Sequence, residues 1–395
     1  MHERKLRWWL PVLLVAAVGA ALVAGLAATR ADAGSGEVRI AMIAALTGSL
    51  SNVGIDNRRG MEAALKEVNA SGGVNGRKLV IDVFDDTSNP SQSVQLMQRI
   101  AADSRYLGVI GSGFSSSSLA NAPLAEQFKI PYISMAGSGR QVYPAKPYLY
   151  TTTATSRLFA YSMARYLRSK KISRIALIAD TGGYGSEGTA NVTQLARAYG
   201  LEIVVQEDFP LTATSFTSQL TKVRGSNAQA IWIYNATPAS VAITKEARQL
   251  GLQQLIVLTG GNASATYLEP ACPQSNGAVI SSHIGLVAKY LPKTNPSKTV
   301  ALKVGRLVGG NISTFVFDGY TGVRMFRQAM LRGGYSREGI NTALETKLRG
   351  FVGPAGVYNY TKLNHAGLSL RNMAISQIKN CQMVPVPGQN LTGKK

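Results

Sequence analysis

The 395-residue chain contains only three histidines and two cysteines, and these are scattered rather than grouped. A protein metal site needs such ligands at short, regular spacing, so the sequence predicts none. Neither a Gly-x-Gly-x-x-Gly nor a Walker sequence follows any predicted strand, which argues against a nucleotide site. Ala136-Gly137-Ser138-Gly139 has the wrong spacing for a nucleophile elbow, and no base lies near it. We therefore expect no enzyme, no catalytic residue and no cofactor.

Acidic residues are also scarce, since 21 Asp and Glu stand against 42 Lys and Arg, for a net charge of +21. Such a balance is typical of nucleic-acid-binding proteins. Here, however, the basic residues form only pairs such as Arg58-Arg59, without a basic stripe interleaved with aromatic residues. We expect no nucleic-acid partner. The charge either steers an anionic ligand, attracts an anionic membrane or partner, or only keeps the protein soluble.

Long apolar runs are absent after the first 33 residues, but one lies within them. Basic residues precede an apolar run from Leu10 to about Ala28, and Ala31-Asp32-Ala33 has the small-x-small pattern of a cleavage site. This pattern predicts a secretory signal peptide over residues 1–33, cleaved near Ala33. An uncleaved membrane anchor is the alternative, because the run is close to the ~20 residues that span a bilayer.

Predicted strands and helices alternate along the rest of the chain. A first series of short apolar runs lies at residues 38–46, 79–84, 106–110 and 130–135. A helix is expected over residues 55–69, and Asn89 with Pro90 marks the start of another. A second series of strands covers 174–179, which echoes 39–44, and then 201–205, 229–234 and 254–258. This rhythm predicts an α/β fold of two lobes, each a parallel sheet covered by helices on both faces.

Glycine and small polar residues follow these strands at their carboxyl ends, where ligands of parallel sheets bind. We therefore expect one cleft to be lined by the loops at residues 112–118, 136–139, 182–185, 235–238 and 260–262. Serines open a helix in the first loop, and the unpaired amides of a helix start suit a carboxylate, although serines also cap helices without any ligand. The first two loops contain no acid, base or metal ligand, which indicates binding rather than catalysis.

Both cysteines, Cys272 and Cys381, lie in the part of the chain that we expect to be exported. An even number of cysteines in an oxidising compartment favours a disulfide. The bond would join a mid-chain loop to the C-terminal tail, and we expect it to be structural.

Several short segments, each weak alone, together carry a family resemblance across the exported part. They include Ala45-Leu46-Thr47-Gly48, Asn69-Ala70-Ser71-Gly72-Gly73, Asp180 with Tyr184-Gly185, and Phe351-Val352-Gly353-Pro354-Ala355-Gly356. In these segments the chain resembles the type I periplasmic binding proteins of the leucine/isoleucine/valine-binding family, the solute receptors of ABC importers. The resemblance implies two Rossmann-like lobes joined by three crossovers, with residues 37–152 plus 283–352 in one and 153–282 plus 353–390 in the other. It also implies a periplasmic monomer that works with membrane permease subunits.

The resemblance further implies which residues bind the ligand. In amino-acid-binding members, two loops of the N-terminal lobe hold the ligand carboxylate. These roles fall here on Ser115, beside Phe114, and on Ser138, with Ala136 offering its backbone carbonyl. Residues of the second lobe would close over the ligand, namely Tyr184, Asn235, Gly261 and Asn262.

The chain departs from the family pattern after the strand at residues 254–258. Amino-acid-binding members place an acidic partner for the ligand ammonium there, whereas this chain reads Thr259-Gly260-Gly261-Asn262. A buried ammonium without a counter-ion is costly. We therefore expect a small ligand with a carboxylate and no amino group, either aromatic or short aliphatic, or an amide. The alternatives are an amino acid whose ammonium meets another acid, such as Glu187 or Glu269, and a ligand-sensing ectodomain.

Overall fold

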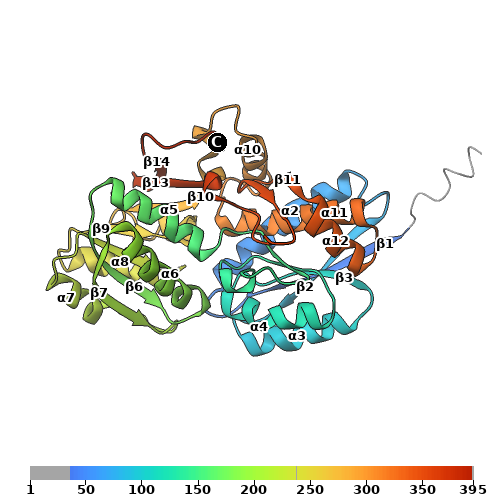
Figure 1. The fold of residues 1–395 in the computed structure, drawn as a ribbon, viewed down its shortest axis with the longest axis horizontal. Coiled ribbons are helices and arrows are strands. Elements are labelled where there is room, and N and C mark those ends of the chain that lie inside the picture. The colour runs from blue at the N-terminus through green and yellow to red at the C-terminus, as the bar shows by residue number, and fades with distance from the viewer. Residues whose placement is uncertain (1–35, 237, 394–395) are drawn as a thin grey trace, which may run out of the picture.

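The computed structural model describes residues 36–236 and 238–393 and consists of two α/β lobes that lie side by side (Figure 1). Green and yellow elements form the lobe at the left, and blue, cyan and orange elements form the lobe at the right. The predicted signal peptide and its cleavage site lie outside the described residues. Within the described ranges, no helix combines the length and the apolar character needed to cross a membrane.

The first lobe is built on a parallel sheet with the strand order β2-β1-β3-β4-β5. The strands are β1 (Glu37–Ala44), β2 (Lys78–Asp85), β3 (Tyr106–Ile110), β4 (Tyr132–Ser134) and β5 (Leu149–Thr151). Its helices are α2 (Ser51–Ala70), α3 (Pro90–Ala102), α4 (Ser115–Gln127), α11 (Thr314–Gly333) and α12 (Arg337–Lys347). The last two come from far along the chain, so this lobe is discontinuous in sequence.

Helices α2 and α11 pack closely because glycine stands where their backbones meet. A Cβ atom at Gly60 would lie only 1.9 Å from the carbonyl oxygen of Val316. Asn57 of α2 donates its Nδ2–H to the carbonyl oxygen of Phe315 at 2.9 Å, which fixes the start of α11. The expected helix at residues 55–69 thus lies inside α2, and it positions a segment that is distant in sequence.

The second lobe is built on a mixed sheet with the strand order β14-β13-β10-β9-β8-β6-β7. Its parallel strands are β6 (Arg174–Asp180), β7 (Glu202–Phe209), β8 (Ala230–Tyr234), β9 (Leu255–Leu258) and β10 (Val279–His283). An antiparallel hairpin extends the sheet through β13 (Met373–Lys379) and β14 (Gln382–Pro385). The helices are α5 (Ser156–Ser169), α6 (Gly183–Tyr199), α7 (Thr217–Arg224), α8 (Ala239–Gln249) and α9 (Ala265–Leu268).

Local sequence signals explain several boundaries. Asn89 accepts hydrogen bonds from the backbone amides of Ser91 and Gln92 at 2.9 and 3.3 Å, and Pro90 is the first residue of α3, as predicted. Strand β3 has the predicted limits, while β4 is shorter than the apolar run that predicted it. The hairpin of β13 and β14 was not predicted, because the sequence pattern suggested only parallel strands.

The central strands are apolar on both faces because helices cover the sheets on both sides. In β1, for example, every residue from Ile40 to Ala44 is fully buried. Between the lobes, Nε2 of His283 accepts a hydrogen bond from the backbone amide of Ala154 at 3.0 Å, which ties the end of β10 to the segment after β5. Burial lowers the pKa of His283 to about 3, so this ring is neutral.

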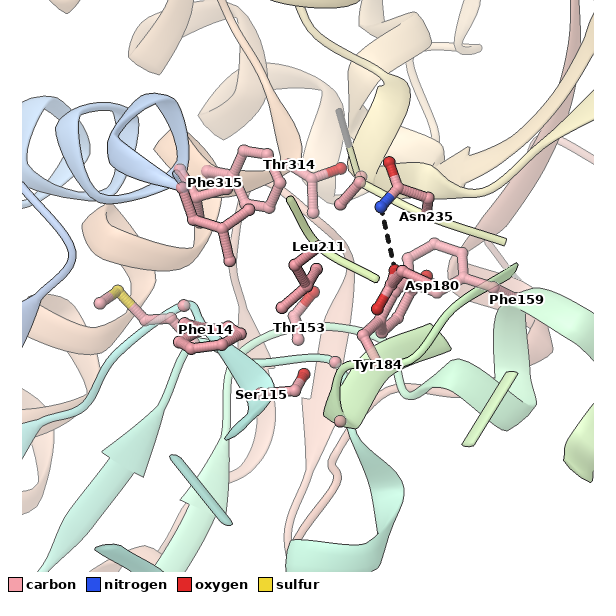
Figure 2. Close-up of a pocket in the computed structure, with 18 residues that line it drawn as sticks. Phe114, Ser115, Thr153, Phe159, Asp180, Tyr184, Leu211, Asn235, Thr314 and Phe315 are labelled. Carbon is pink, nitrogen blue, oxygen red and sulfur yellow. Dashed lines mark hydrogen bonds between the residues drawn. The ribbon is translucent and has the colours of Figure 1, made fainter. Parts of the chain in front are cut away.

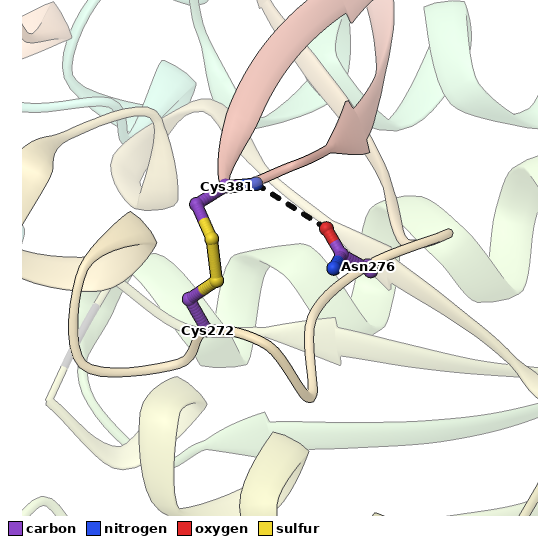
Figure 3. The surroundings of a disulfide bond; sticks show 3 residues. All are labelled: Cys272, Asn276 and Cys381. Atoms are coloured by element: carbon purple, nitrogen blue, oxygen red, sulfur yellow. Dashed lines mark hydrogen bonds between the residues drawn. A yellow bond between two sulfur atoms is a disulfide. The ribbon is translucent and has the colours of Figure 1, made fainter.

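The two cysteines form the predicted disulfide (Figure 3). Cys272 lies in the loop between α9 and β10, and Cys381 lies in the turn between β13 and β14, with 5.6 Å between their Cα atoms. The backbone amide of Cys381 also donates to Oδ1 of Asn276 at 3.3 Å. The bond therefore fastens the antiparallel hairpin to the parallel part of the second sheet.

The remaining elements lie around the junction of the lobes and near the C-terminus. They are α10 (Ser297–Leu307), a two-stranded sheet of β11 (Arg349–Val352) and β12 (Val357–Asn359), and the 3-10 turns η1 (Gly139–Gln141), η2 (Gly260–Asn262), η3 (Ile284–Tyr290) and η4 (Leu370–Asn372).

Candidate ligand-binding site

A small pocket with a volume of about 60 Å³ lies between the two lobes (Figure 2). It is located where the carboxyl ends of strands from both sheets meet. Every one of the five loops expected from the sequence contributes to its wall: Gly113, Phe114 and Ser115; Gly137; Gly183 and Tyr184; Asn235 and Ala236; and Gly261. Both lobes thus contribute to the wall of the pocket.

Most of the pocket wall is apolar. The side chains come from both lobes, α11 of the first lobe included, and they are those of Leu50, Val53, Phe114, Met135, Phe159, Leu211 and Phe315. Tyr184 adds an aromatic face from the second lobe, and its ring centroid lies 5.2 Å from that of Tyr234. The ring also approaches Gly137 of the first lobe so closely that a Cβ atom there would lie 2.8 Å from its Cε2.

Polar groups converge on the pocket from the N-terminus of α4. Ser115 is the first residue of this helix, and the preceding Phe114 supplies no side-chain cap. The hydroxyl of Ser112 accepts a hydrogen bond from the backbone amide of Phe114 at 3.2 Å and so shapes the turn into the helix. Because the first amides of a helix have no intrahelical acceptor, the pocket faces a region of partial positive charge.

Helix α6 of the second lobe begins directly opposite α4. The backbone amide of Gly183 donates to the hydroxyl of Ser116 at 3.0 Å, so the two helix starts touch across the cleft. Of the described residues that line the pocket, none is Lys, Arg or His. The partial positive charge at this side of the pocket therefore comes from backbone amides at the helix starts rather than from a lining side chain.

One carboxyl group, that of Asp180, lies in the pocket wall at the end of β6. Its Oδ1 accepts from the backbone amide of Gly182 at 2.8 Å. Its Oδ2 accepts from Nδ2 of Asn235 at 3.0 Å, as Figure 2 shows. Burial raises the pKa of Asp180 above its ordinary value. The pocket wall thus contains an acid that is satisfied by neutral donors alone.

The predicted site residues fall into two groups. Five of them line the pocket: Phe114, Ser115, Tyr184, Asn235 and Gly261. The other three, Ala136, Ser138 and Asn262, lie outside its lining and bond to the protein itself. The Ala136 carbonyl accepts from Nε2 of Gln141 at 2.7 Å, and Nδ2 of Asn262 donates to the Asn235 carbonyl at 2.7 Å.

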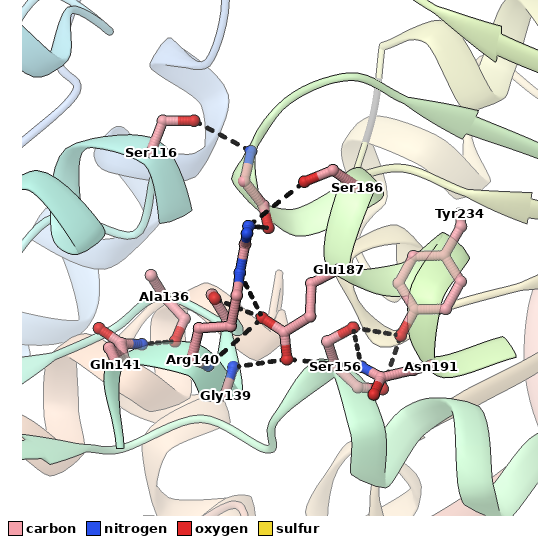
Figure 4. Close-up of polar contacts among 12 residues, drawn as sticks. Ser116, Ala136, Gly139, Arg140, Gln141, Ser156, Ser186, Glu187, Asn191 and Tyr234 are labelled. Atoms are coloured by element: carbon pink, nitrogen blue, oxygen red, sulfur yellow. Dashed lines mark hydrogen bonds and ion pairs between the residues drawn. The ribbon is translucent and has the colours of Figure 1, made fainter. Parts of the chain in front are cut away.

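Ser138 bonds to an acid from the opposite lobe. Its hydroxyl donates to Oε2 of Glu187, and the amide of Gly139 donates to Oε1 of the same carboxylate at 2.9 Å (Figure 4). Glu187, one of the two acids suggested as an ammonium partner, is therefore held outside the pocket lining. The other, Glu269, is exposed and also lies outside it.

Some pocket residues were missed by the sequence reasoning. Asp180 could have been found, because it directly follows the predicted strand at residues 174–179 and thus meets the rule that selected Asn235. Thr314 and Phe315 had no such signal, since they begin a helix that reaches the pocket only through its packing on α2. The Thr314 hydroxyl donates to the carbonyl oxygen of Gly260 at 2.9 Å, which joins α11 to the second lobe.

Residues 37–382 match a family model described as "Periplasmic binding protein". The chain is 25% identical over 254 residues to Leu/Ile/Val-binding protein homolog 8 of Brucella suis biovar 1, a match that covers 62% of this chain and 63% of that protein. The matched part of the chain thus spans less than two thirds of the relative's length.

Two solved structures have a closely similar fold at low sequence identity. An extracellular ligand-binding receptor from Rhodopseudomonas palustris HaA2 superposes with a TM-score of 0.83 at 20% identity, covering 89% of this chain and 99% of that one. A solute-binding protein of an ABC transporter from R. palustris, in complex with benzoate, has a TM-score of 0.78 at 16% identity, covering 89% and 95%. Because the family model spans most of the sequence, the chain belongs to the type I periplasmic binding proteins, the family that includes the Leu/Ile/Val-binding proteins.

Proposed function

We propose that the protein is the periplasmic receptor of an ABC importer and that it binds a small ligand with an apolar body and a carboxylate or amide end. The main support for this function is the composition of the pocket between the lobes. It combines apolar and aromatic walls with the hydroxyl and amides at the start of α4. Such a pocket suits reversible binding, and none of the described residues that line it is His or Cys.

The polar end of the ligand is assigned to the Ser115 side of the pocket. A carboxylate there accepts hydrogen bonds from the Ser115 hydroxyl and from the first amides of α4, and it gains from the helix dipole. An amide oxygen can use the same donors. The overall positive charge of the chain adds a long-range attraction for anions.

The apolar body of the ligand is assigned to the space among Phe114, Phe159, Tyr184 and Phe315. Aromatic side chains favour an aromatic or branched aliphatic group because they bury large apolar areas at defined angles. The benzoate complex of a solute-binding protein with a similar fold supports an aromatic acid as one candidate.

Closure of the lobes is the proposed binding step. The ligand docks on the first lobe at Ser115, and the second lobe then presents Tyr184, Asn235 and Gly261. Contacts to both lobes shift the population toward the closed form, which the permease subunits of the importer recognise.

An amino acid is the second candidate, and the carboxyl group of Asp180 in the pocket wall favours it. This acid would pair with a ligand ammonium from a place that the family pattern did not suggest. The name of the Brucella relative points in the same direction.

A thermal-shift panel on refolded protein tests the proposal. The probes are benzoate, butyrate, benzamide, leucine and valine, with benzylamine as a control of similar shape and opposite charge. A probe at a hundred times its dissociation constant adds ~2.7 kcal/mol to the free energy of unfolding. We expect stabilisation by an acid or amide. Stabilisation by leucine or valine alone selects the second candidate, and stabilisation by benzylamine alone contradicts both.

A further inference from the structure

We propose that Glu187 determines ligand specificity by occupying the donors of the Ser138 loop, residues 136–140, and that it latches the lobes together. The part of this inference that concerns the ligand rests on the proposed function. The latch itself rests only on contacts within the chain.

The Glu187 carboxylate comes from α6 of the second lobe and lies on the Ser138 loop of the first. Its Oε2 accepts from the Ser138 hydroxyl and from the amide of Arg140 at 3.4 Å, and its Oε1 accepts from the amide of Gly139 at 2.9 Å (Figure 4). Asn191, one turn further along α6, donates to Oε1 at 3.4 Å. Both oxygens are therefore satisfied, mostly by groups of the opposite lobe.

The contact between Glu187 and the Ser138 loop is buried between the lobes, so it depends on their closure. Glu187 is 8% exposed and Ser138 is fully buried. When the lobes separate, Glu187 moves away with α6. The hydrogen bonds between its carboxylate and the donors of the Ser138 loop then break together. A charge-assisted hydrogen bond is stronger than one between neutral groups, so these bonds favour the closed arrangement.

Neighbouring contacts reinforce the latch at the same helix start. Nη2 of Arg140 donates to the carbonyl oxygen of Gly183 at 3.1 Å and to the hydroxyl of Ser186 at 3.3 Å. Nε of Arg140 lies 3.7 Å from Oε2 of Glu187. The first lobe thus offers a cation, a hydroxyl and two amides to one short segment of α6.

The latch has a consequence for the ligand. A ligand carboxylate on the Ser138 loop would compete with Glu187 for the same donors and would be repelled by its charge. The ring of Tyr184 also packs on Gly137, beside Ser138. The polar end of the ligand is therefore confined to the Ser115 side, and the receptor selects ligands that need only one loop of the first lobe.

Chemical rescue of Glu187→Ala by acetate tests the latch without any knowledge of the natural ligand. The variant removes the carboxylate and leaves both the donors and the space for a small carboxylate. Amide hydrogen exchange of residues 136–140 measures whether the loop is protected. Glu202→Ala is the matched control, because Glu202 is an exposed acid on β7 of the same lobe.

In Glu187→Ala we expect the Gly139 amide to exchange roughly 10- to 100-fold faster than in the wild type, as the loss of a charge-assisted bond implies. Acetate at high millimolar concentration should restore most of the protection, whereas acetamide should not. Acetate should not change the exchange rate of the Gly139 amide in the wild type or in Glu202→Ala. Small-angle scattering should show a larger radius of gyration for Glu187→Ala and a return toward the wild-type value with acetate.

Unchanged exchange and radius in Glu187→Ala would overturn the latch, as would an equal effect of acetate on the wild type. If Glu187→Ala does not fold, Glu187→Gln tests the latch by amide exchange alone, because it keeps the shape, lacks the charge and leaves no space for acetate. It should show intermediate exchange of the Gly139 amide, and exchange equal to that of the wild type would overturn the latch. The ligand panel can fail while acetate rescue succeeds, and the reverse is equally possible, so the latch and the proposed function are judged separately.

Discussion

Asn235 donates its Nδ2–H to Oδ2 of Asp180 at 3.0 Å, and this bond joins the ends of β8 and β6 in the wall of the pocket. The hydroxyl of Ser240 in turn donates to Oδ1 of Asn235 at 3.1 Å, which orients the amide. Asp180 is thus held in place by neutral donors, while burial raises the pKa of its carboxyl group. Replacement of this acid therefore offers a test between two proposed classes of ligand, those with an amino group and those without one.

The variant Asp180→Asn should separate the two candidate ligand classes. If the ligand lacks an amino group, its affinity should stay the same or rise, because a carboxyl group that repels anions is gone. If the ligand is an amino acid, its affinity should fall by roughly 10- to 100-fold with the loss of a charge-assisted contact. Isothermal titration with the probe that stabilises the wild type measures the change.

The double variant Asp180→Asn with Asn235→Asp is the control for this experiment. It keeps one amide and one carboxyl at the ends of β6 and β8, so the local hydrogen bond can form again. If the single variant binds nothing and the double variant binds every probe normally, the loss reflects local structure, and Asp180 does not discriminate between ligands.

Ser115→Ala should weaken binding while leaving the fold intact. The hydroxyl lies at the start of α4 in the pocket wall, and a hydrogen bond to a charged group contributes about 1.5–3 kcal/mol. We expect a loss of roughly 10- to 100-fold in affinity for an acidic probe and an unchanged circular dichroism spectrum. Ser91→Ala, at an exposed position in α3, is the control. Equal affinities of Ser115→Ala and wild type would remove Ser115 from the proposed site.

The repeated strand and helix pattern predicted most of the fold, because each buried parallel strand leaves a local signal. β3 has the predicted limits, and the cap at Asn89 depends only on neighbouring residues. The hairpin of β13 and β14 depends instead on pairing with β10, roughly ninety residues earlier, and no local pattern records that contact.

The sequence predicted those pocket residues that lie after the ends of strands. It did not predict contacts between residues on opposite sides of the cleft. Asn235 directly follows β8, and Ser115 lies in the loop region after β3, so a general rule for parallel sheets places both in the pocket. Ser138 satisfies the same rule, yet its partner Glu187 is 49 residues away on the other lobe. Phe315 reaches the pocket only because α11 packs on α2, which a single sequence does not reveal.

Removal of the disulfide should lower the stability of the protein substantially. Cys272 and Cys381 are 109 residues apart, and the loss of a native bond that closes so long a loop costs about 2–5 kcal/mol. We expect Cys272→Ser with Cys381→Ser to unfold at lower urea concentration, while ligand binding is kept because the bond lies away from the pocket wall. Wild-type protein in reductant should behave like the variant, and equal midpoints of oxidised and reduced protein would contradict the prediction.

Asp318 of α11 should make the stability of the protein depend on pH. It is fully buried, and burial raises the pKa of its carboxyl group well above the ordinary 3.8, although hydrogen bonds from Thr153 and Thr152 act in the opposite direction. A group with a raised folded-state pKa contributes stability below its unfolded-state pKa, and this contribution is lost as the pH rises toward the folded-state value. Relative to Asp318→Asn, the wild type should therefore lose stability above about pH 4, with a slope of at most ~1.4 kcal/mol per pH unit.

Asp82 provides a control of opposite sign for this measurement. Burial pushes the pKa of Asp82 upward, but hydrogen bonds from Arg39 and Tyr106 outweigh it and lower the pKa overall. The contribution of Asp82 to the free energy of unfolding is therefore present above its unfolded-state pKa, and it is lost as the pH falls toward its lower folded-state pKa. Urea unfolding between pH 3 and 7 should then show the stability difference between wild type and Asp82→Asn growing with pH, while that for Asp318→Asn changes in the other direction. Parallel curves for the wild type and Asp318→Asn would mean that Asp318 keeps an ordinary pKa in the folded protein and that its surroundings in α11 are open to water.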